Sequence, residues 1–316
     1  MPVFLTVLLF IVGLVLIVKG GDFFVDAATW IAEATGIPHF IIGATIVSLA
    51  TTLPEIIVSS IAAMQGKVDM AIGNAVGSVT ANTGLIMGLS VLFIPAVIKR
   101  AKFIPKAVLM LLATAALLLL TFKTGSLGPI GAIVMFVIFA VFIYENIASA
   151  RGEMGAADKP PVDKKQTFPN ILKFVGGAAA IVLGADLLVD NGSALATLMG
   201  APESLVALTF VAIGTSLPEL VTAITAIRKK QSSLSVGNII GANIIDMTLI
   251  LPICSLISGG TLPVSAQTYT LDLPVCLLIM LIAMAPTMIR GKFSRWQGAL
   301  TMVLYIGYMV LLAVIA

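Results

Sequence analysis

The chain has 316 residues, of which 59% are hydrophobic and only 10% are charged, and its formal net charge at pH 7 is +3. Soluble domains carry about 25% charged residues, so this composition and the mean hydropathy of +1.13 argue against a soluble enzyme and against a disordered chain. Two cysteines, Cys254 and Cys276, lie in apolar segments and make neither a disulfide framework nor a zinc site. The remaining class is an integral membrane protein with most of its chain in lipid.

Ten stretches are apolar enough to cross a bilayer, whose hydrocarbon core needs about 20 residues per helix. The first stretch lacks the basic region and cleavage site of a signal peptide, so it is interpreted as a retained helix. The predicted helices are 3–31, 39–64, 70–95, 104–122, 127–149, 170–198, 203–227, 234–258, 268–288 and 295–315. The connection 150–169 holds prolines, glycines and mixed charges, so we expect a flexible cytoplasmic linker there. The expected fold class is therefore an all-α membrane protein of ten helices.

The basic residues favour one side of the membrane. The four connections that follow the helices 70–95, 127–149, 203–227 and 268–288 hold 15 of the 18 lysines and arginines. The opposite side holds only Lys67 and Lys123. Cytoplasmic loops are enriched in Lys and Arg, so these four connections are expected in the cytoplasm. Both termini are then expected on the non-cytoplasmic side of the plasma or inner membrane.

Two parts of the chain match without a gap at an offset of 164 residues. The matched pairs include Gly20 with Gly184, Asp22 with Asp186, Asp26 with Asp190, Pro54 with Pro218, Glu55 with Glu219, and Asn74 with Asn238. We interpret the chain as two five-helix units, 1–149 and 170–316, joined by the linker 150–169. Because five is odd, the units enter the membrane from opposite sides. Inverted repeats of this kind are typical of secondary transporters, whose sites lie near the midplane where the repeats meet.

Two glutamates lie beside prolines inside predicted helices, in Ser48-Leu-Ala-Thr-Thr-Leu-Pro-Glu55 and Ala212-Ile-Gly-Thr-Ser-Leu-Pro-Glu219. A proline there removes a backbone hydrogen bond, and the freed carbonyls are tolerated in a membrane only beside protein, water or an ion. Carboxylates, hydroxyls and bare carbonyls are hard oxygen ligands that suit Ca²⁺ and, by the same logic, Na⁺. A packing role for Glu55 and Glu219 is the alternative. It is disfavoured because the helices around them supply no basic partner.

The helices 70–95 and 234–258 carry matched polar residues next to glycines, which by themselves only allow close helix packing. Asn82 in the first matches Asp246 in the second, and Ser78 matches Ala242. Asp246 is a third intramembrane acid without a basic partner, which again favours ion binding. The four aspartates of the helices 3–31 and 170–198, by contrast, are interpreted as polar residues near one interface rather than as an ion vestibule. They are Asp22, Asp26, Asp186 and Asp190.

At these residues the sequence resembles the Ca²⁺/cation antiporter superfamily and, within it, the prokaryotic sodium/calcium exchangers. The motifs that carry the resemblance are Gly43-Ala-Thr-Ile-Val-Ser-Leu-Ala-Thr-Thr-Leu-Pro-Glu55 with Gly73-Asn-Ala-Val-Gly-Ser78, and Gly214-Thr-Ser-Leu-Pro-Glu219 with Gly237-Asn-Ile-Ile-Gly-Ala-Asn243. The resemblance implies a Ca²⁺ site formed by Glu55 and Glu219 with backbone oxygen near Thr51 and Thr215. The Na⁺ sites it implies are lined by Thr51, Thr52, Ser78, Thr215 and Ser216 and by the carbonyls of Ser48 and Ala212. It places Asn82 and Asp246 in the middle of the cluster, and makes the helices 3–31 and 170–198 a sliding gate.

One position departs from the family pattern, because Ala242 stands where sodium-dependent relatives usually have serine. A methyl group cannot bind Na⁺, so the expected exchange of Ca²⁺ for Na⁺ keeps an alternative in which H⁺ or K⁺ is coupled to Ca²⁺. A membrane enzyme that uses Glu55 and Glu219 as acid and base is disfavoured, because the sequence shows no catalytic motif. A passive cation channel is the third class considered. No cofactor, nucleic acid or protein partner is expected, only the transported ions and the lipid bilayer.

Overall fold

A computed structural model describes residues 2–154, 164–198 and 216–315. In the first half the helical elements are α1 (Val3–Thr35), α2 (His39–Ile42), η1 (Gly43–Val47), α3 (Ser48–Thr51), α4 (Leu53–Met64), α5 (Val68–Ala81), η2 (Asn82–Met87), α6 (Gly88–Phe93), α7 (Arg100–Thr124) and α8 (Pro129–Met154). In the second half they are α9 (Lys164–Leu198), α12 (Leu217–Arg228), α13 (Ser232–Ile245), η4 (Asp246–Ile250), α14 (Leu251–Ile257), η5 (Thr268–Asp272), α15 (Leu273–Arg290) and α16 (Arg295–Ile315). The elements named η are π-helical turns. Two short strands, β1 (Ser126–Leu127) and β2 (Leu262–Pro263), pair antiparallel, with Leu127 opposite Leu262.

The all-helical fold agrees with the sequence prediction. Within the described ranges, eight helices are long and apolar enough to span a membrane, and the bent helix from α2 to α4 makes a ninth. Their ends lie within one or two turns of the predicted ones. The remaining predicted helix, 203–227, begins on residues outside the described ranges, so only its second half is observed, as α12. The total of ten therefore stays a prediction.

The connection predicted as a flexible linker, 150–169, is shorter than expected. Helix α8 continues to Met154, and α9 begins at Lys164 with Pro169 inside it. Both helix ends are rich in Lys, Glu, Gln, Met and Ala, which favour helix in water as well as in lipid. A hydropathy pattern therefore ends α8 too early and begins α9 too late.

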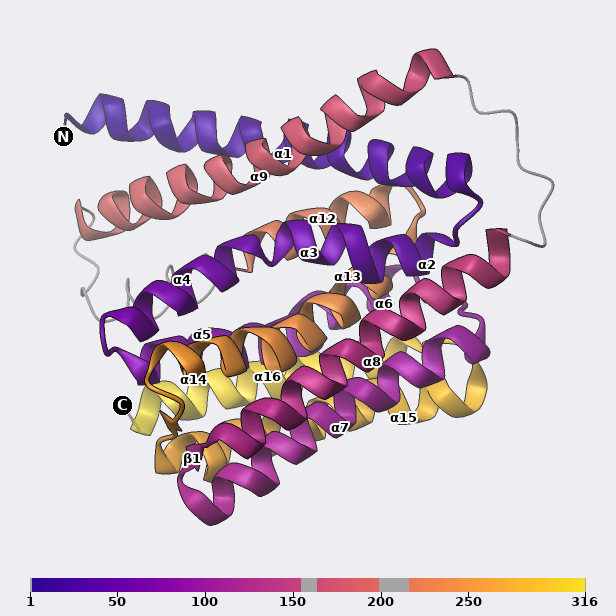
Figure 1. The fold of residues 1–316 in the computed structure, drawn as a ribbon. Helices are drawn as coiled ribbons and strands as arrows, with labels where there is room; N and C mark the ends of the chain where they lie inside the picture. Colours follow the sequence, from indigo (N-terminus) through magenta and orange to yellow (C-terminus); the bar gives the residue numbers. More distant parts are fainter. Residues whose placement is uncertain (1, 155–163, 199–215, 316) are drawn as a thin grey trace.

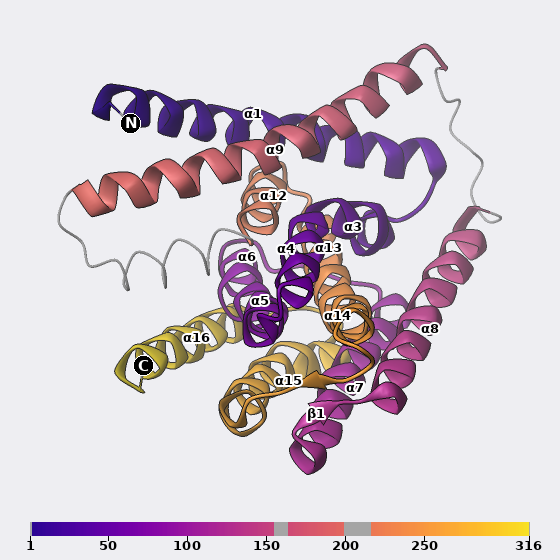
Figure 2. The ribbon, with the colours of Figure 1, turned by 60° about the vertical axis from the view of Figure 1, so that its left-hand side comes forward.

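Helices α1 and α9 form a layer of their own. They lie side by side across one face of the molecule, and the remaining helices form a bundle beneath them (Figures 1 and 2). Glycines make this contact close: a Cβ on Gly177 would lie 2.8 Å from the Gly20 carbonyl oxygen, and one on Gly184 would lie 2.8 Å from the Gly13 carbonyl oxygen. The two backbones therefore touch without side chains between them, as in small-residue helix contacts in membranes.

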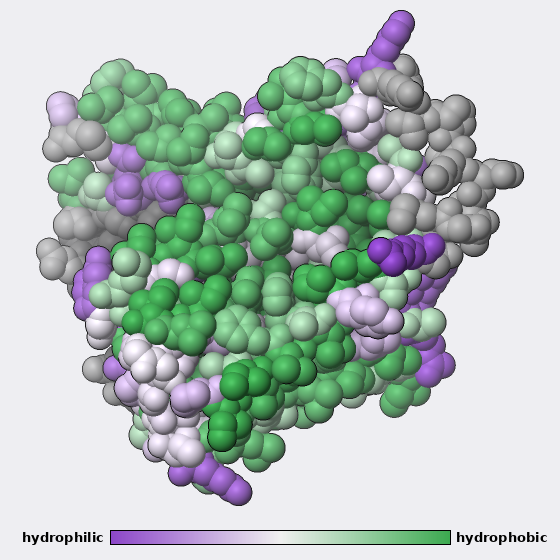
Figure 3. All heavy atoms as spheres, viewed as in Figure 1, coloured by the Kyte–Doolittle hydropathy of each residue, from purple (hydrophilic) through white to green (hydrophobic). Residues whose placement is uncertain are grey.

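The surface is divided as a membrane protein requires. Apolar residues form a wide zone across the view of Figure 3, and hydrophilic residues gather towards the ends of the helices. Both termini lie at the same end of the bundle (Figure 1). The helix ends at Arg100, Arg228 and Arg290 lie at the opposite end, in keeping with the uneven distribution of basic residues.

Several of the 15 basic residues expected in cytoplasmic connections lie inside helices, and among those whose side chains the structure describes Lys106 is the buried one. Lys106 lies inside α7 with a fully buried side chain, and its amine pairs with Glu145 of α8. The amine also lies 5.7 Å from the centre of the Phe40 ring. The partner carboxylate explains how a lysine is accommodated inside the bundle.

Candidate cation site

The two Leu-Pro-Glu sequences produce the same local structure. The helix over residues 39–64 bends by 44° between α3 and α4, at Thr52. Thr52 has φ −85° and ψ −1°, and Ser216, which precedes α12, has φ −89° and ψ 5°. In each case the proline falls in the first turn of the following helix, where its missing N–H costs no hydrogen bond.

This geometry places both glutamates at helix N-termini. Glu55 lies in the first turn of α4 and Glu219 in the first turn of α12. The positive end of a helix dipole stabilises a negative charge at that position. The break therefore does two things: it brings a carboxylate to the middle of the bundle, and it supports the charge of that carboxylate.

The site contains three buried acids. The exposed fraction is 1% for Glu55 and 0% for Glu219 and Asp246. Within the described ranges, both carboxylate oxygens of Glu55 and Asp246, and Oε2 of Glu219, have no hydrogen-bond partner. Helix α4, which carries Glu55, packs against η4, which carries Asp246. Unpaired carboxylates in an apolar interior are costly, so the arrangement calls for cations from outside the chain.

Three side-chain contacts join the two halves of the chain at this site. Thr52 Oγ1 donates to Glu219 Oε1 at 3.3 Å, and Thr51 Oγ1 donates to Asn238 Oδ1 at 3.1 Å. Ser216 Oγ donates to Ser78 Oγ at 3.3 Å. Of the hydroxyl groups predicted as ligands, that of Thr52 therefore contacts a carboxylate of the opposite half, while those of Ser216 and Ser78 contact each other across the two halves.

The predicted residues Asn82 and Asp246 occupy equivalent places. Asn82 begins the π-helical turn η2, and Asp246 begins η4. Such turns inside α-helices are frequent at functional sites. Both side chains are buried, and neither amide atom of Asn82 has a hydrogen-bond partner in the described chain. Ala242 is fully buried on α13 and presents a methyl group where the first half has the Ser78 hydroxyl.

The predicted backbone ligand in the first half is already partly engaged. The carbonyl oxygen of Ser48 accepts the Thr52 N–H at 2.9 Å and the Thr51 hydroxyl at 3.4 Å. The Ser48 hydroxyl donates to the Thr45 carbonyl at 3.0 Å. The two predicted ligands Thr215 and Ala212 lie outside the described ranges.

Sequence reasoning missed the amides that support these helices. Asn74 Nδ2 donates to Ser59 Oγ at 2.9 Å and to the Glu55 carbonyl oxygen at 3.5 Å. Its repeat partner, Asn238, accepts from Thr51, as described above. A third amide, Asn243 Nδ2, donates to Thr83 Oγ1 at 2.8 Å. The signal was present in the sequence, because a Gly-Asn pair recurs at both matched positions.

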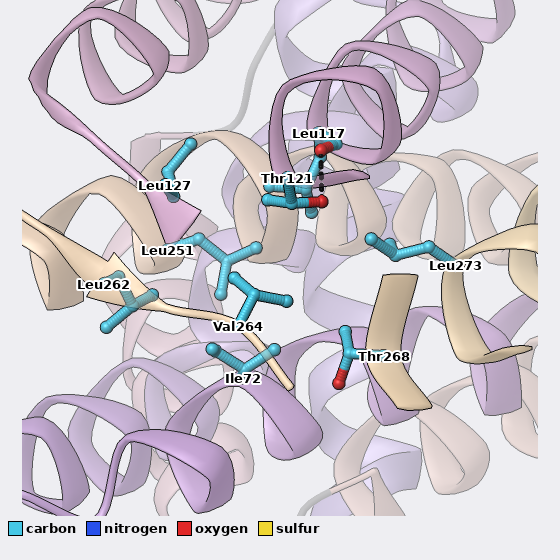
Figure 4. Close-up of a pocket in the computed structure, with 9 residues that line it drawn as sticks. All are labelled: Ile72, Leu117, Thr121, Leu127, Leu251, Leu262, Val264, Thr268 and Leu273. Carbon is cyan, nitrogen blue, oxygen red and sulfur yellow. Dashed lines mark hydrogen bonds between the residues drawn. The ribbon is translucent and has the colours of Figure 1, made fainter. Parts of the chain in front are cut away.

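No group of three His, Cys, Asp or Glu side chains in the described ranges is arranged to hold one ion by itself. Hydroxyl, amide and backbone oxygens would have to complete any coordination shell. The pocket shown in Figure 4 is a separate feature, lined by Leu117, Leu127, Leu251 and other apolar residues. One of its hydroxyls, Thr121 Oγ1, already donates to the Leu117 carbonyl at 2.7 Å. This pocket lacks carboxylates and is not a candidate ion site.

The aspartates of α1 have cationic partners. Lys229, at the end of α12, lies 2.7 Å from Asp26 Oδ1, and its amine donates to the Asp22 backbone carbonyl at 2.8 Å. Arg228 lies 3.8 Å from Asp22 Oδ1. These acids therefore take part in a contact between two helices. This is similar to the role expected from the sequence, which is that of polar residues near one interface.

Comparison with known proteins identifies the family to which the chain belongs. The profile described as "Sodium/calcium exchanger protein" matches residues 5–148 and again residues 170–314. The chain is 29% identical to the sodium/calcium exchanger MaX1 of Methanosarcina acetivorans, over 96% of this chain and 97% of that protein. It is 34% identical to the inner membrane protein YrbG of Escherichia coli, over 87% and 86% of the two chains.

The fold agrees with a solved exchanger. A structure of the sodium-calcium exchanger NCX_Mj, soaked with Na⁺ and Sr²⁺, superposes with a TM-score of 0.84 at 27% sequence identity. The match covers 98% of this chain and 99% of that one. With both halves matched by the profile and nearly the whole chain matched in sequence and structure, the chain belongs to the sodium/calcium exchanger family of the Ca²⁺/cation antiporter superfamily.

Proposed function

We propose that this protein is a secondary transporter that exchanges Ca²⁺ for Na⁺ across the membrane by alternating access. The observation that carries the proposal is the pair Glu55 and Glu219, two buried carboxylates at matched helix N-termini without a basic partner in the described chain. Calcium takes 6–8 oxygen ligands at about 2.3–2.6 Å, and carboxylates are its preferred charged ligands. In the proposal these two acids bind Ca²⁺ together with backbone oxygens near Thr51 and Thr215.

Sodium would use the neutral oxygens around the same acids. The proposed ligands are the hydroxyls of Thr51, Thr52, Ser78, Thr215 and Ser216 and the carbonyls of Ser48 and Ala212, with Asn82 and Asp246 at the centre. Because Thr52 hydrogen-bonds Glu219, a Na⁺ ion near this hydroxyl would share the carboxylate with Ca²⁺. Overlapping sites make the two ions compete, and this competition couples their movements. The names of MaX1 and NCX_Mj, both sodium/calcium exchangers, support the assignment.

The two halves provide a route for alternating access. The family profile matches each half separately, and α12 and α13 begin 164 residues after α4 and α5. We propose units 1–149 and 170–316 as inverted repeats that exchange roles between the outward-open and inward-open states. The layer of α1 and α9, which packs on one face of the bundle, would be the element that moves.

Counter-transport in proteoliposomes tests the proposal. Vesicles loaded with Na⁺ and diluted into Na⁺-free medium should take up radioactive Ca²⁺, and uptake should stop when the Na⁺ gradient is removed. Uptake that ignores the Na⁺ gradient would overturn sodium coupling. Flux that needs no counter-ion on the other side would instead identify a channel.

A second candidate couples Ca²⁺ to H⁺ or K⁺. Two observations favour it: Ala242 gives the second half a methyl group where the first half has the Ser78 hydroxyl, and Asp246 is a buried titratable group at the start of η4. The same vesicles, loaded with K⁺ or with acidic buffer instead of Na⁺, distinguish the candidates. Calcium uptake that follows the pH or K⁺ gradient and ignores Na⁺ would establish this second candidate.

A further inference from the structure

Two connections from different halves of the chain are joined at the end of the bundle that carries the basic residues. The Ile98 N–H donates to the Gly291 carbonyl at 3.1 Å, and the Phe293 N–H donates to the Ala96 carbonyl at 3.1 Å. Val97 and Lys292 lie opposite each other in this short antiparallel bridge. We call the two segments, 93–100 and 288–296, the 97–292 junction.

Contacts with neighbouring residues hold the backbone of the junction in place. The Phe293 ring is buried and meets the Phe103 ring edge-on, with 5.6 Å between ring centres. Arg100 Nε donates to the Met288 carbonyl at 2.9 Å. Gly291 has φ +69°, a conformation that favours glycine and allows the turn into the bridge. The exposed side chains of the junction are therefore presented on an anchored backbone.

Positive charges converge on this surface. Its exposed basic residues are Lys99, Arg100, Arg290, Lys292 and Arg295. Within the described chain, Arg290, Lys292 and Arg295 form no ion pair with an acidic side chain. The junction thus concentrates positive charge at one end of the membrane-spanning bundle.

An apolar surface adjoins the charges. Val97 is 79% exposed, Ile289 72% and Phe93 62%, and the indole of Trp296 is also exposed. Tryptophan side chains favour the headgroup level of a bilayer. The junction therefore combines cations, exposed apolar side chains and an interfacial aromatic side chain.

The other end of the molecule provides an internal comparison. There β1 pairs with β2, and the Val264 N–H donates to the Gly125 carbonyl at 2.9 Å. This pairing joins the connections 125–128 and 258–267, neither of which contains Lys or Arg. A bridge between two connections therefore forms in this fold without cations. The charges of the 97–292 junction are therefore not needed to form its bridge. The preference of basic residues for one side of the membrane does not by itself require that two connections be joined.

We propose that the 97–292 junction binds the phosphate headgroup of an anionic phospholipid. Arg290, Lys292 and Arg295 would contact the phosphate, since guanidinium and ammonium groups form charge-assisted hydrogen bonds with phosphate oxygens. The acyl chains would lie on Phe93, Val97 and Ile289, with Trp296 at the headgroup level. This inference concerns a surface separate from the ion site and holds whichever ion drives transport.

Native mass spectrometry of the full chain with added lipid tests the proposal. Phosphatidylglycerol is expected to bind the unaltered chain more tightly than phosphatidylcholine. The triple variant Arg290→Gln, Lys292→Gln, Arg295→Gln should bind phosphatidylglycerol at least about fivefold more weakly. The matched control, Arg151→Gln, Lys173→Gln, Lys230→Gln, removes three exposed cations outside the junction and should change binding less than about twofold. Equal losses in both triple variants, or no preference for the anionic lipid, would overturn the proposal.

Two further measurements use the unaltered chain, so they do not depend on a variant that folds. A photoactivatable phosphatidylglycerol should label peptides covering 93–100 and 288–296 above all others, whereas even labelling around the bundle would contradict the site. Inorganic phosphate at millimolar concentration should not displace the lipid, because it lacks acyl chains. Full displacement would identify a site for free phosphate instead of lipid.

Discussion

At the scale of single residues, glutamine tests whether charge matters at Glu55 and Glu219, because it has nearly the same shape as glutamate. Replacing either glutamate by glutamine keeps an oxygen at the helix N-terminus but removes a negative charge from the proposed Ca²⁺ site. We expect Glu55→Gln and Glu219→Gln each to lower Ca²⁺ uptake into proteoliposomes below about a tenth of the unaltered rate. Thermal unfolding in detergent should change little, since neither carboxylate has a basic partner in the described chain.

Glu33→Gln is the matched control for these variants, because Glu33 is exposed on α1. Its Ca²⁺ uptake should equal that of the unaltered protein. Full transport by Glu55→Gln or Glu219→Gln would refute the assignment of that residue as a ligand.

A substitution at Ala242 tests which ion drives transport. The variant Ala242→Ser restores a hydroxyl at the position that matches Ser78. If Na⁺ drives transport, this extra oxygen should lower the Na⁺ concentration that half-saturates Ca²⁺ exchange by about two- to tenfold. Ala107→Ser, also at a fully buried alanine but on α7, should leave the Na⁺ dependence unchanged. An unaltered Na⁺ dependence in Ala242→Ser would favour H⁺ or K⁺ coupling.

At the scale of elements, the ion pair between the buried Lys106 and the partly exposed Glu145 joins α7 and α8. The Glu145 carboxylate also accepts the Ser149 hydroxyl at 2.7 Å, so it is held on both sides. Lys106→Met leaves Glu145 without its cation. Loss of one partner of a fully buried pair costs about 3–5 kcal/mol, and the 19% exposure of the Glu145 side chain makes the cost smaller here. We expect a lower melting temperature in detergent.

The double variant Lys106→Met, Glu145→Leu distinguishes the effect of an unpaired carboxylate from the effect of lost packing. It removes both charges, so it should recover most of the lost stability. A double variant as unstable as Lys106→Met alone would show that the lysine stem, not the charge pair, stabilises the helices.

Helices α1 and α12 are joined by ion pairs that the other half does not repeat. Lys229 binds Asp22 and Asp26, but the residue that matches Lys229 at the 164-residue offset is Gln65, which is uncharged. Lys229→Gln should therefore loosen the middle of α1, seen as faster amide hydrogen exchange over residues 20–28. Lys230→Gln, a change at the neighbouring exposed lysine, should not alter this exchange. Unchanged exchange in Lys229→Gln would show that glycine packing against α9 alone holds α1.

At the scale of the whole molecule, the sequence predicts those features that depend on neighbouring residues. Hydropathy predicts the helices, and Leu-Pro-Glu predicts a break, since a proline acts on its own turn. Contacts across the repeats cannot be read in this way. Thr51 meets Asn238 only because α3 packs on α13, and a single sequence contains no sign of that partner choice. The burial of Lys106 cannot be predicted from the sequence for the same reason, because its carboxylate partner comes from another helix.

The orientation of the whole molecule is predicted from the distribution of charge, and this prediction can be tested directly. Cys254 and Cys276 are buried and free, so an introduced surface cysteine can be labelled against a low background. A membrane-impermeant maleimide should label Thr261→Cys in intact spheroplasts, because the connection 258–267 lies at the same end as both termini. Lys230→Cys, at the end that carries the basic residues, should be labelled only after the membrane is opened. The reverse pattern would place the termini in the cytoplasm, contradict the positive-inside rule for this chain and move the 97–292 junction to the outer leaflet.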